Sequence, residues 1–397
     1  MGKINKLRVF EAFAGIGCQS IALRNLGINF EVVGIMEVDR YALLGYDAIH
    51  NSGEHVNEIS KDEMINEVSK RNILYNFTTG KSEIPKNIDD LNKVYKAHIR
   101  NKNYGDIRLI NPNDLPDFDL FTYSFPCKNI SVEGKQDSLE KDSGTASSLM
   151  WECLKIIEIK RPKYLLMENV KNILAYNHKP HFDKFCNILE SYGYVNHYDI
   201  LNSLNFGLPS NRERCMMFSV LKEYDKGQNM PKGERTDKKI FDILDNNHNH
   251  KFDLKGKEME NFLEMIQLVD GKLRVPNGTK LGYLDMNIPG VFDFNRIKSK
   301  TRRGRVKENG VIAGTVTASE PNFVYVELKK GSVYPRKLSS LELWRLLGHS
   351  DDDFYKCEDI LPERKLRERA GRSIAIPMLE EIFKVYLEDY VNEKDIK

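Results

Sequence analysis

A short apolar segment from Leu120 to Phe125 gives the clearest single indication of the fold. Its aromatic and β-favouring residues are bounded by Asp119 and Pro126, a pattern typical of a short buried strand. Cys127 follows at once, on the turn that leaves this strand. Open α/β sheets bind ligands outside the carboxyl ends of their strands, so a thiol there would be presented to a ligand. The alternative is that Cys127 is buried and inert, as cysteines usually are.

Other segments of the first 220 residues alternate between strand and helix patterns. Strand patterns occupy Lys6–Phe13, Glu31–Met36, Lys163–Asn169, Tyr194–Leu201 and Cys215–Val220. Helical spacing lies between them, at Ile21–Leu26, Tyr41–His50, Leu149–Ile159 and Asp183–Tyr192. Because strands that alternate with helices form sheets covered by helices, the sequence predicts an α/β fold.

The first strand pattern ends in a glycine turn, Ala14-Gly15-Ile16-Gly17, which precedes a helix. Glycines at such a turn let the backbone approach a ligand, and the helix that follows offers unpaired N–H groups. Glu37 ends the second strand about twenty residues later, where nucleotide-binding units place a carboxylate for ribose hydroxyls. A plain tight turn and a solvated glutamate are the alternatives.

Two parallel strands would bring Cys127 close to a carboxylate. Glu168 ends another strand pattern 41 positions after Cys127, and the helical pattern Leu149–Ile159 lies between them. That length suits a strand–helix–strand unit, so both groups are expected at one edge of the sheet. Arg212 and Arg214 precede the last strand pattern of this region, either near the same edge or as solvated surface residues.

Charge and cysteine content narrow the class of protein. A net charge of +2 over 397 residues does not imply a polyanionic partner. Any argument for nucleic-acid binding therefore depends on local clusters of basic residues. In the strongest cluster, Arg296–Lys307, seven of twelve residues are Lys or Arg, which indicates a solvated loop or a phosphate-binding patch. The six cysteines form no CxxC pair, so neither a zinc site nor a disulfide framework is indicated. With no signal or membrane segment, the protein is expected to be cytoplasmic.

Six motifs stand in the order found in DNA (cytosine-5)-methyltransferases, and the chain resembles a bacterial member of that family. They are FEAFAGIG at 10–17, SFPC at 124–127, ENV at 168–170, NRER at 211–214, RKLSSLELWRLLGH at 336–349 and GRSIAIP at 371–377. The resemblance implies the Rossmann-like mixed sheet of S-adenosylmethionine-dependent methyltransferases, with helices on both faces, and a smaller target-recognition domain. It also implies a catalytic domain in two parts, 1–220 and 331–397, separated by the recognition domain at 221–330.

The resemblance assigns roles to individual residues. Cys127 would be the nucleophile, Glu168 the group at cytosine N3, and Arg212 and Arg214 the basic residues beside the active site. S-adenosylmethionine would be the cofactor, with no metal, and would contact Phe13, Ala14, Gly15, Ile16, Gly17, Glu37, Val38, Asp106, Ile107, Pro126, Leu149, Ser373 and Ile374. DNA would contact Lys128, Ser131, Glu133, Lys135, Gln136, Arg296, Lys298, Lys300, Arg302, Arg303, Arg305, Thr315 and Val316. Three residues depart from the usual pattern of the family: Lys128, Glu133 and Arg372.

These roles meet a chemical requirement of cytosine, whose C5 is too poor a nucleophile to take a methyl group directly. A thiolate that adds to C6 makes C5 electron-rich, so that C5 can attack a sulfonium methyl group. A free thiol has a pKa of about 8.5, which nearby cations lower. The target base must also leave the stacked duplex to reach the thiol.

The expected partner is double-stranded DNA, bound by a monomer that has no association with a membrane. A cognate restriction endonuclease is possible but not physically required. The alternatives are an RNA cytosine-5 methyltransferase on the same scaffold and a DNA-binding regulator without catalysis. The region 221–330 is large enough for a DNA reader, which argues against the first. The intact set of Cys127, Glu168, Arg212 and Arg214 argues against the second, because a pure binder does not need it.

Overall fold

The chain divides into two compact units. The first comprises Met1–Leu201, Glu213–Lys232 and Met378–Lys397, and the second comprises Asn202–Arg212 and Gly233–Pro377. The computed structural model describes residues 6–51, 53, 55–76, 81–126, 149–247, 250–276, 283–293, 306–318 and 323–391.

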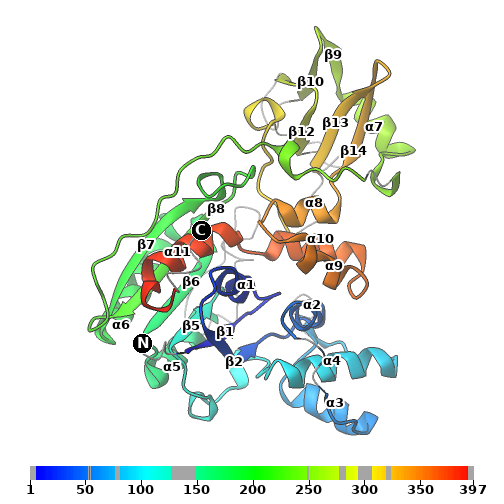
Figure 1. The fold of residues 1–397 in the computed structure, drawn as a ribbon. Coiled ribbons are helices and arrows are strands. Elements are labelled where there is room, and N and C mark those ends of the chain that lie inside the picture. Colours follow the sequence, from blue (N-terminus) through cyan, green and yellow to red (C-terminus); the bar gives the residue numbers. More distant parts are fainter. Residues whose placement is uncertain are drawn as a thin grey trace. The chain divides into compact units, whose positions relative to one another are not determined.

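A six-stranded sheet organises the first unit, with the strand order β2-β1-β5-β6-β8-β7 (Figure 1). Its strands are β1 (Leu7–Ala12), β2 (Phe30–Met36), β5 (Leu120–Tyr123), β6 (Tyr164–Val170), β7 (Tyr194–Asn202) and β8 (Glu213–Leu221). The helices of this unit are α1 (Cys18–Asn25), α2 (Arg40–His50), α3 (Lys61–Lys70), α4 (Ile88–Arg100), α5 (Met150–Lys160), α6 (Lys179–Ser191) and α11, which spans Ile376–Tyr386 and enters this unit at Met378.

The sheet is mixed, as predicted. The pairs β1–β2, β1–β5 and β5–β6 are parallel, whereas β8 runs antiparallel to β6. Parallel neighbours present their carboxyl ends at the same edge, so β5 and β6 both end where the predicted active site begins. The predicted α/β class is confirmed.

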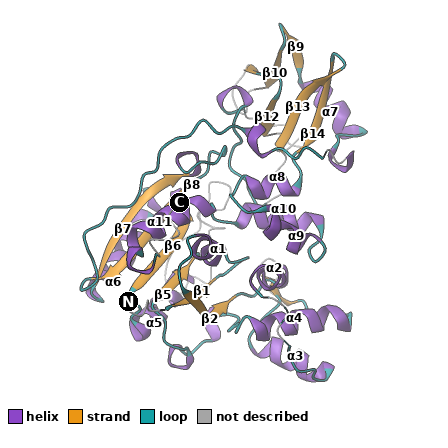
Figure 2. Cartoon of the chain, viewed as in Figure 1, coloured by secondary structure: helices purple, strands orange, loops and turns teal. Residues whose placement is uncertain are grey.

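Helices cover both faces of the sheet (Figure 2). On one face, apolar side chains of α5 and α6 share a buried cluster with Met217 of β8. The next residue, Phe218, points to the other face because side chains alternate along a strand. There its ring stacks on Tyr386 of α11, with 4.4 Å between the ring centroids. Asn25 of α1 also donates a hydrogen bond to Glu380 of α11, at 2.7 Å, which links the two helices.

The described residues of the insert 51–104 fold into a layer of their own, although the sequence pattern there predicts a single helix, near Asp89–Lys102, and no function. Helix α3 contributes Met64 and Val68 to a buried cluster, and α4 contributes Leu91 and Val94. Both helices pack in this cluster with residues of α2. A two-stranded hairpin, β3 (Tyr75–Asn76) and β4 (Lys81–Ser82), belongs to the same insert.

The second unit contains two antiparallel three-stranded sheets, β11-β10-β9 and β12-β13-β14. Its elements are α7 (Lys257–Met265), β9 (Gln267–Val269), β10 (Lys272–Pro276), β11 (Tyr283–Met286), β12 (Gly290–Asp293), β13 (Phe323–Lys329), β14 (Ser332–Lys337), α8 (Ser340–Arg345), α9 (Asp351–Glu358) and α10 (Glu363–Arg372). Phe262 of α7 packs among apolar residues of both sheets. Within the described residues of either unit, no helix is long and apolar enough to cross a membrane.

The two units divide the chain differently from the predicted domains. Residues 331–377 are predicted to return to the catalytic part, yet by their contacts they group with the second unit. Only from Met378 does the chain rejoin the first unit. The predicted domains are defined by function, either catalysis or the reading of DNA, and the contacts that define the two units do not test function. The predicted domain division therefore stays a prediction.

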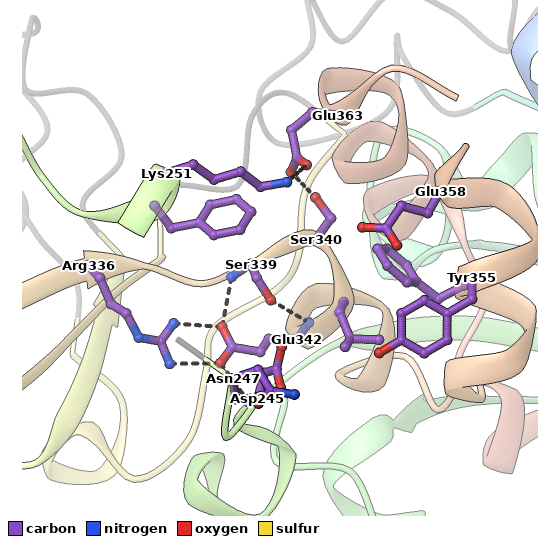
Figure 3. Close-up of a pocket in the computed structure, with 13 residues that line it drawn as sticks. Asp245, Asn247, Lys251, Arg336, Ser339, Ser340, Glu342, Tyr355, Glu358 and Glu363 are labelled. Carbon is purple, nitrogen blue, oxygen red and sulfur yellow. Dashed lines mark hydrogen bonds and ion pairs between the residues drawn. The ribbon is translucent and has the colours of Figure 1, made fainter. Parts of the chain in front are cut away.

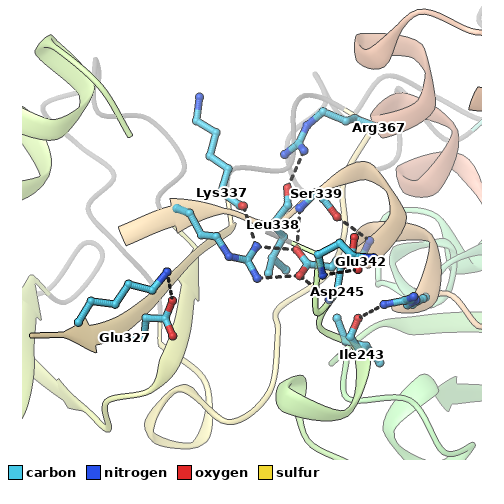
Figure 4. Close-up of polar contacts among 12 residues, drawn as sticks. Ile243, Asp245, Glu327, Lys337, Leu338, Ser339, Glu342 and Arg367 are labelled. Carbon is cyan, nitrogen blue, oxygen red and sulfur yellow. Dashed lines mark hydrogen bonds and ion pairs between the residues drawn. The ribbon is translucent and has the colours of Figure 1, made fainter. Parts of the chain in front are cut away.

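A buried ion pair fixes the corner between β14 and α8 (Figure 4). Glu342 is fully buried, and its carboxylate accepts hydrogen bonds from the two terminal nitrogens of Arg336, at 2.7 and 2.8 Å. The same carboxylate accepts backbone N–H groups of Ser339, at 2.7 Å, and Asp245, at 3.0 Å. Four donors therefore surround one buried charge.

Replacing Glu342 with alanine is expected to lower the free energy of unfolding by about 3–5 kcal/mol, because Arg336 would remain buried without its counter-charge. Urea unfolding of the whole chain measures this loss. The matched control is Glu327→Ala, since Glu327 pairs with Lys329 at 3.0 Å on a half-exposed surface. That variant is expected to lose less than about 1 kcal/mol. Equal losses in the two variants would contradict the assignment.

Candidate active site

The carboxyl ends of β5 and β6 form the centre of the candidate site. Asn169, which is buried, donates a hydrogen bond from Nδ2 to the Phe125 carbonyl at 3.1 Å. This bond ties the chain that leaves β5 to the end of β6, next to Glu168. The described chain reaches Pro126 and resumes after residue 148, so Cys127 lies outside the described residues. Its role as nucleophile stays a prediction.

Glu168 and Arg214 form an ion pair between β6 and β8. The antiparallel register sets Glu168 opposite Met216 and Val170 opposite Arg214, so the charged pair are diagonal neighbours on one face. Arg214 Nε lies 2.9 Å from Glu168 Oε1, and the two side chains are 14% and 13% exposed. The structure thus brings these two predicted residues together, with the carboxylate oriented by the guanidinium.

Arg212 is held by backbone carbonyls in the second unit. It is 3% exposed, and its terminal nitrogens donate to the carbonyls of Val316 at 2.7 Å, Ser373 at 2.8 Å and Gly371 at 3.2 Å. The predicted DNA contact Thr315 lies beside it and donates from Oγ1 to the Asn211 carbonyl at 2.8 Å. Arg212 therefore joins three segments of the chain, and its predicted place beside the base stays a prediction.

The glycine turn after β1 is hydrogen-bonded to the carboxylate at the end of β2. Gly15 N–H donates to Glu37 Oε2 at 2.9 Å, and Glu37 Oε1 accepts the N–H groups of Val38 and Asp39, both at 2.8 Å. Gly15 has φ +60°, and no described heavy atom lies within 4 Å of where a Cβ would stand. A fixed carboxylate beside an open glycine turn fits the ribose and methionine parts of S-adenosylmethionine.

Asn103 and Asp106 complete this corner of the first unit. Asn103 Oδ1 accepts the Glu37 N–H at 3.0 Å, and its Nδ2 donates to the Glu37 carbonyl at 2.9 Å. Asp106 is 2% exposed, and its carboxylate accepts hydrogen bonds from Arg108 and Asn72. The two segments predicted to bind ribose and adenine are therefore joined through Asn103.

The remaining predicted contacts are distributed among both units. Ile107 and Leu149 are buried in the first unit, and Ser373 and Ile374 are buried in the second. The departure Arg372 is exposed and pairs with Glu368 of the same helix at 2.6 Å. The predicted DNA contacts outside the described residues are Lys128, Ser131, Glu133, Lys135, Gln136, Arg296, Lys298, Lys300, Arg302, Arg303 and Arg305.

A buried carboxylate, Glu11, lies in β1 just before the glycine turn. It is fully buried and accepts hydrogen bonds from the Ser20 N–H at 3.2 Å, the Ser20 hydroxyl at 3.0 Å and the Tyr46 hydroxyl at 2.7 Å. Burial raises the pKa of Glu11 from 4.5 to about 7, although these hydrogen bonds act in the opposite direction. Glu11 thus links β1, α1 and α2 behind the turn.

Glu11 is expected to make the stability of the protein pH-dependent. Because the folded-state pKa is the higher one, the folded state holds a proton that the unfolded state has lost, so stability falls as the pH rises from about 4.5 to about 7. The shift corresponds to a loss on the order of 3 kcal/mol. Urea unfolding at pH 5 and pH 8 would show this loss in wild type but not in Glu11→Gln. A Glu11→Gln protein with the wild-type pH dependence would refute the assignment.

The five described cysteines, Cys18, Cys153, Cys186, Cys215 and Cys357, are all buried. Burial raises the pKa of Cys186 and of Cys357 to about 12, and it also raises the pKa of Cys153 and Cys215. A thiol that stays protonated is a poor nucleophile. Cys153, Cys186, Cys215 and Cys357 therefore have a packing role, which is the alternative that the sequence offers for a single cysteine.

A pocket in the second unit is separate from the predicted chemistry (Figure 3). It encloses about 80 Å³ and is lined by residues from Asp245 to Glu363, none of which is a predicted catalytic or cofactor-binding residue. Both of its cationic side chains pair with carboxylates of the lining: Lys251 with Glu363 at 3.1 Å, and Arg336 with Glu342 at 2.7 Å. Within the described chain, no group of three or more His, Cys, Asp or Glu residues is placed to hold a metal ion.

Sequence reasoning missed the polar residues that support the site. Asn169, Asn103 and Glu11 contact the predicted residues or the turn that carries them, but none was singled out. Asn169 is next to Glu168 in the ENV motif, which was a signal for it. For Asn103 and Glu11 the partners are distant or buried, and a single sequence offers no comparable signal.

Comparisons with known proteins agree with the resemblance. Residues 77–388 match the family described as C-5 cytosine-specific DNA methylase. The type II methyltransferase M2.ScrFI of Lactococcus lactis subsp. cremoris is 40% identical, with 95% of this chain and 98% of that protein covered. The orphan methyltransferase M.SssI of Spiroplasma monobiae is 32% identical, with 96% and 97% covered.

A solved structure of the S. pombe Dnmt2 methyltransferase has a TM-score of 0.60 and 16% identity, with 96% of this chain and 99% of that chain covered. This likeness confirms the predicted fold. The family match spans most of the chain, and the sequence relatives cover nearly all of it. The chain therefore belongs to the C-5 cytosine-specific DNA methylase family.

Proposed function

We propose that the chain methylates C5 of a flipped cytosine in duplex DNA through a covalent bond between Cys127 and C6. The observation that carries this proposal is the Glu168–Arg214 ion pair at 2.9 Å, at the end of β6. Asn169 supports it, because it anchors the chain two residues before Cys127 beside that pair. A thiolate and an oriented carboxylate at one sheet edge are the groups that this reaction needs.

The proposed reaction forms a bond to Cys127 and then breaks it again. The Cys127 thiolate adds to C6, and Glu168 hydrogen-bonds the ring at N3 and supplies the proton that N3 gains. Bound S-adenosylmethionine supplies the methyl group that C5 attacks, and S-adenosylhomocysteine leaves. A base then removes the C5 proton, and elimination expels Cys127 as its thiolate while N3 returns its proton to Glu168. Arg214 keeps the Glu168 carboxylate in position, and its charge favours the thiolate form of a nearby cysteine.

The cofactor would be held by the glycine turn and the ends of neighbouring strands. Phe13 to Gly17 would contact its methionine part, Glu37 and Val38 its ribose, and Asp106 and Ile107 its adenine. The open space over Gly15 and the fixed carboxylate of Glu37 support this placement. Pro126, Leu149, Ser373 and Ile374 would complete the cofactor site.

DNA would be bound by the segment after Cys127 and by the basic cluster Arg296–Lys307, whose dense positive charge favours phosphate contacts. Thr315 and Val316 would lie near the base, since they are held together with Arg212. The predicted recognition domain, 221–330, would read base edges in the major groove. We expect a monomer that acts on DNA in the bacterial cytoplasm. A cognate endonuclease is not required for this activity, since the matched relatives are named both as type II and as orphan methyltransferases.

Methyl transfer from labelled S-adenosylmethionine to mixed-sequence duplex DNA tests this function. Base-resolution mapping of 5-methylcytosine is expected to show methylation confined to one short sequence. RNA of mixed sequence serves as the competing substrate. Transfer to RNA but not to DNA, or cofactor binding without transfer to either, would contradict the proposal.

A further inference from the structure

The insert of the first unit contacts both segments that are predicted to bind the adenosine part of the cofactor. The contacts come from one loop, here residues 71–75, which joins α3 to β3 and includes Tyr75, the first residue of β3. The Leu74 N–H donates to the carbonyl of Val38 at 2.8 Å, directly after Glu37. The Arg71 carbonyl accepts the N–H of Asp106 at 2.9 Å. The loop is therefore bonded through its backbone to the predicted ribose segment and to the predicted adenine segment.

Side chains of the same loop set the position of the Asp106 carboxylate. Asn72 Nδ2 donates to Asp106 Oδ2 at 2.7 Å. Arg108 donates from Nε to Asp106 Oδ1 at 3.0 Å, and the Tyr75 ring centroid lies 5.2 Å from its guanidinium carbon. Asn72, one donor to Asp106, thus belongs to the loop. Arg108, the other donor, contacts the loop through Tyr75.

The loop is packed too closely for these contacts to be incidental. Gly105 has φ +77°, and a Cβ at that position would lie 2.2 Å from the Arg71 carbonyl oxygen. Asn72 and Leu74 also have positive φ, of 52° and 77°. A leucine in this conformation is rare and persists only where surrounding structure holds it. The sequence places glycine where the insert approaches the adenine segment.

The chemistry of Asp106 restricts what it can recognise. Burial acts to raise the pKa of Asp106, but the hydrogen bonds from Arg108 and Asn72 outweigh it, and the pKa is lowered. An ionised carboxylate only accepts hydrogen bonds. It therefore favours a 6-aminopurine, which donates from its amino group, over a 6-oxopurine, which presents a carbonyl oxygen.

We propose that residues 71–75 complete the adenosine site, and that Asn72 is a positioning residue which aims Asp106 at the 6-amino group of adenine. The inference rests on the proposed function, since that function assigns Asp106 to adenine. It gives the insert a role in cofactor selection. The insert would act through the orientation of one carboxylate, without taking part in methyl transfer.

Equilibrium binding to the full chain tests this role, measured by calorimetry with S-adenosylhomocysteine and with S-inosylhomocysteine. These ligands differ at purine C6, which carries an amino group in one and a carbonyl oxygen in the other, and at N1, which is protonated only in the 6-oxopurine. Asn72→Asp keeps the size and the tolerance of positive φ but replaces the donor with a second carboxylate. It is expected to weaken S-adenosylhomocysteine about ten-fold, the weight of one hydrogen bond to a charged group, and to reduce the preference over S-inosylhomocysteine by a similar factor. Asn72→Gly, which also tolerates positive φ, is expected to act in the same direction.

Two further variants separate the possible outcomes. Lys93→Ala, on the exposed side of α4 in the same insert, is expected to leave both affinities unchanged. Glu37→Ala is expected to weaken both ligands equally, because they share the ribose. If Glu37→Ala has no effect, the proposed cofactor site is wrong. If it weakens binding but the Asn72 variants keep the wild-type preference, or weaken both ligands equally, the role of the insert is overturned.

Discussion

A Cys127→Ala protein is expected to lose methyl transfer by about 10⁴-fold or more, while it binds S-adenosylhomocysteine as wild type does. Without the thiolate there is no addition at C6, so C5 stays too electron-poor to take the methyl group. Transfer of a labelled methyl group into duplex DNA measures the loss of activity, and calorimetry measures the affinity for S-adenosylhomocysteine.

Cys186→Ala is the matched control for this loss. Cys186 is buried in the first unit and its Sγ lies 3.8 Å from Met217 Sδ, so it is expected to affect packing but not chemistry. Methyl transfer by this variant is expected within a few-fold of wild type. Loss of activity in both variants would remove the special role of Cys127.

A Glu168→Gln protein is expected to have kcat lowered by about 10²–10⁴-fold, the usual contribution of a positioned acid or base. Glutamine has the same shape but cannot supply a proton to N3, and its amide would face the Arg214 guanidinium without a charge. The KM for the cofactor is expected to stay within a few-fold, because Glu168 is not among the residues predicted to hold it. Steady-state kinetics with saturating DNA separates the two parameters.

Glu213→Gln provides a matched control on the adjacent strand. Glu213 precedes Arg214 and pairs with Lys171 at 2.5 Å on a half-exposed surface. Because such pairs contribute little, kcat is expected to change by less than about two-fold. Equal effects of the two substitutions would show that loss of any carboxylate in this region impairs the enzyme.

The sheet could be predicted because its strands have strong local patterns. β5 (LFTY) and the first four residues of β6 (YLLM) are fully buried and mostly apolar or aromatic, and buried parallel strands have that composition. Helix α3 was missed because it buries only Met64 and Val68. A capping box of Ser60 and Glu63 marks its start, and this local signal was available in the sequence.

The second unit is less predictable for a physical reason. Its strands β9, β11 and β12 have three or four residues each, so each has little periodicity of its own. Their stability comes from a shared core around Phe262, and sequence spacing does not reveal which short segments share it. Short strands of this kind are fixed by tertiary packing more than by propensity.

The candidate site was predictable where chemistry depends on residue type and strand position. Glu168 and Arg214 lie at strand ends, and the register brings them together. The partners of the supporting asparagines were not predictable, because they are far away in sequence: Asn103 lies 66 positions from Glu37, and Asn169, although it stands in the ENV motif, lies 44 from Phe125. Two arginines only two positions apart also have different surroundings, and only the fold distinguishes Arg212 from Arg214.

The most direct test of the account is capture of the covalent bond that it requires. Duplex DNA is prepared with 5-fluorocytosine in place of cytosine and incubated with the protein and S-adenosylmethionine. After methyl transfer to such a base there is no C5 proton to remove, so elimination is blocked and the bond from C6 to sulfur persists. Mass spectrometry of the digested complex is predicted to find the base attached to Cys127, and only when the cofactor is present. Methylation of normal DNA with no adduct on the fluorinated DNA, or an adduct on another residue, would contradict the account.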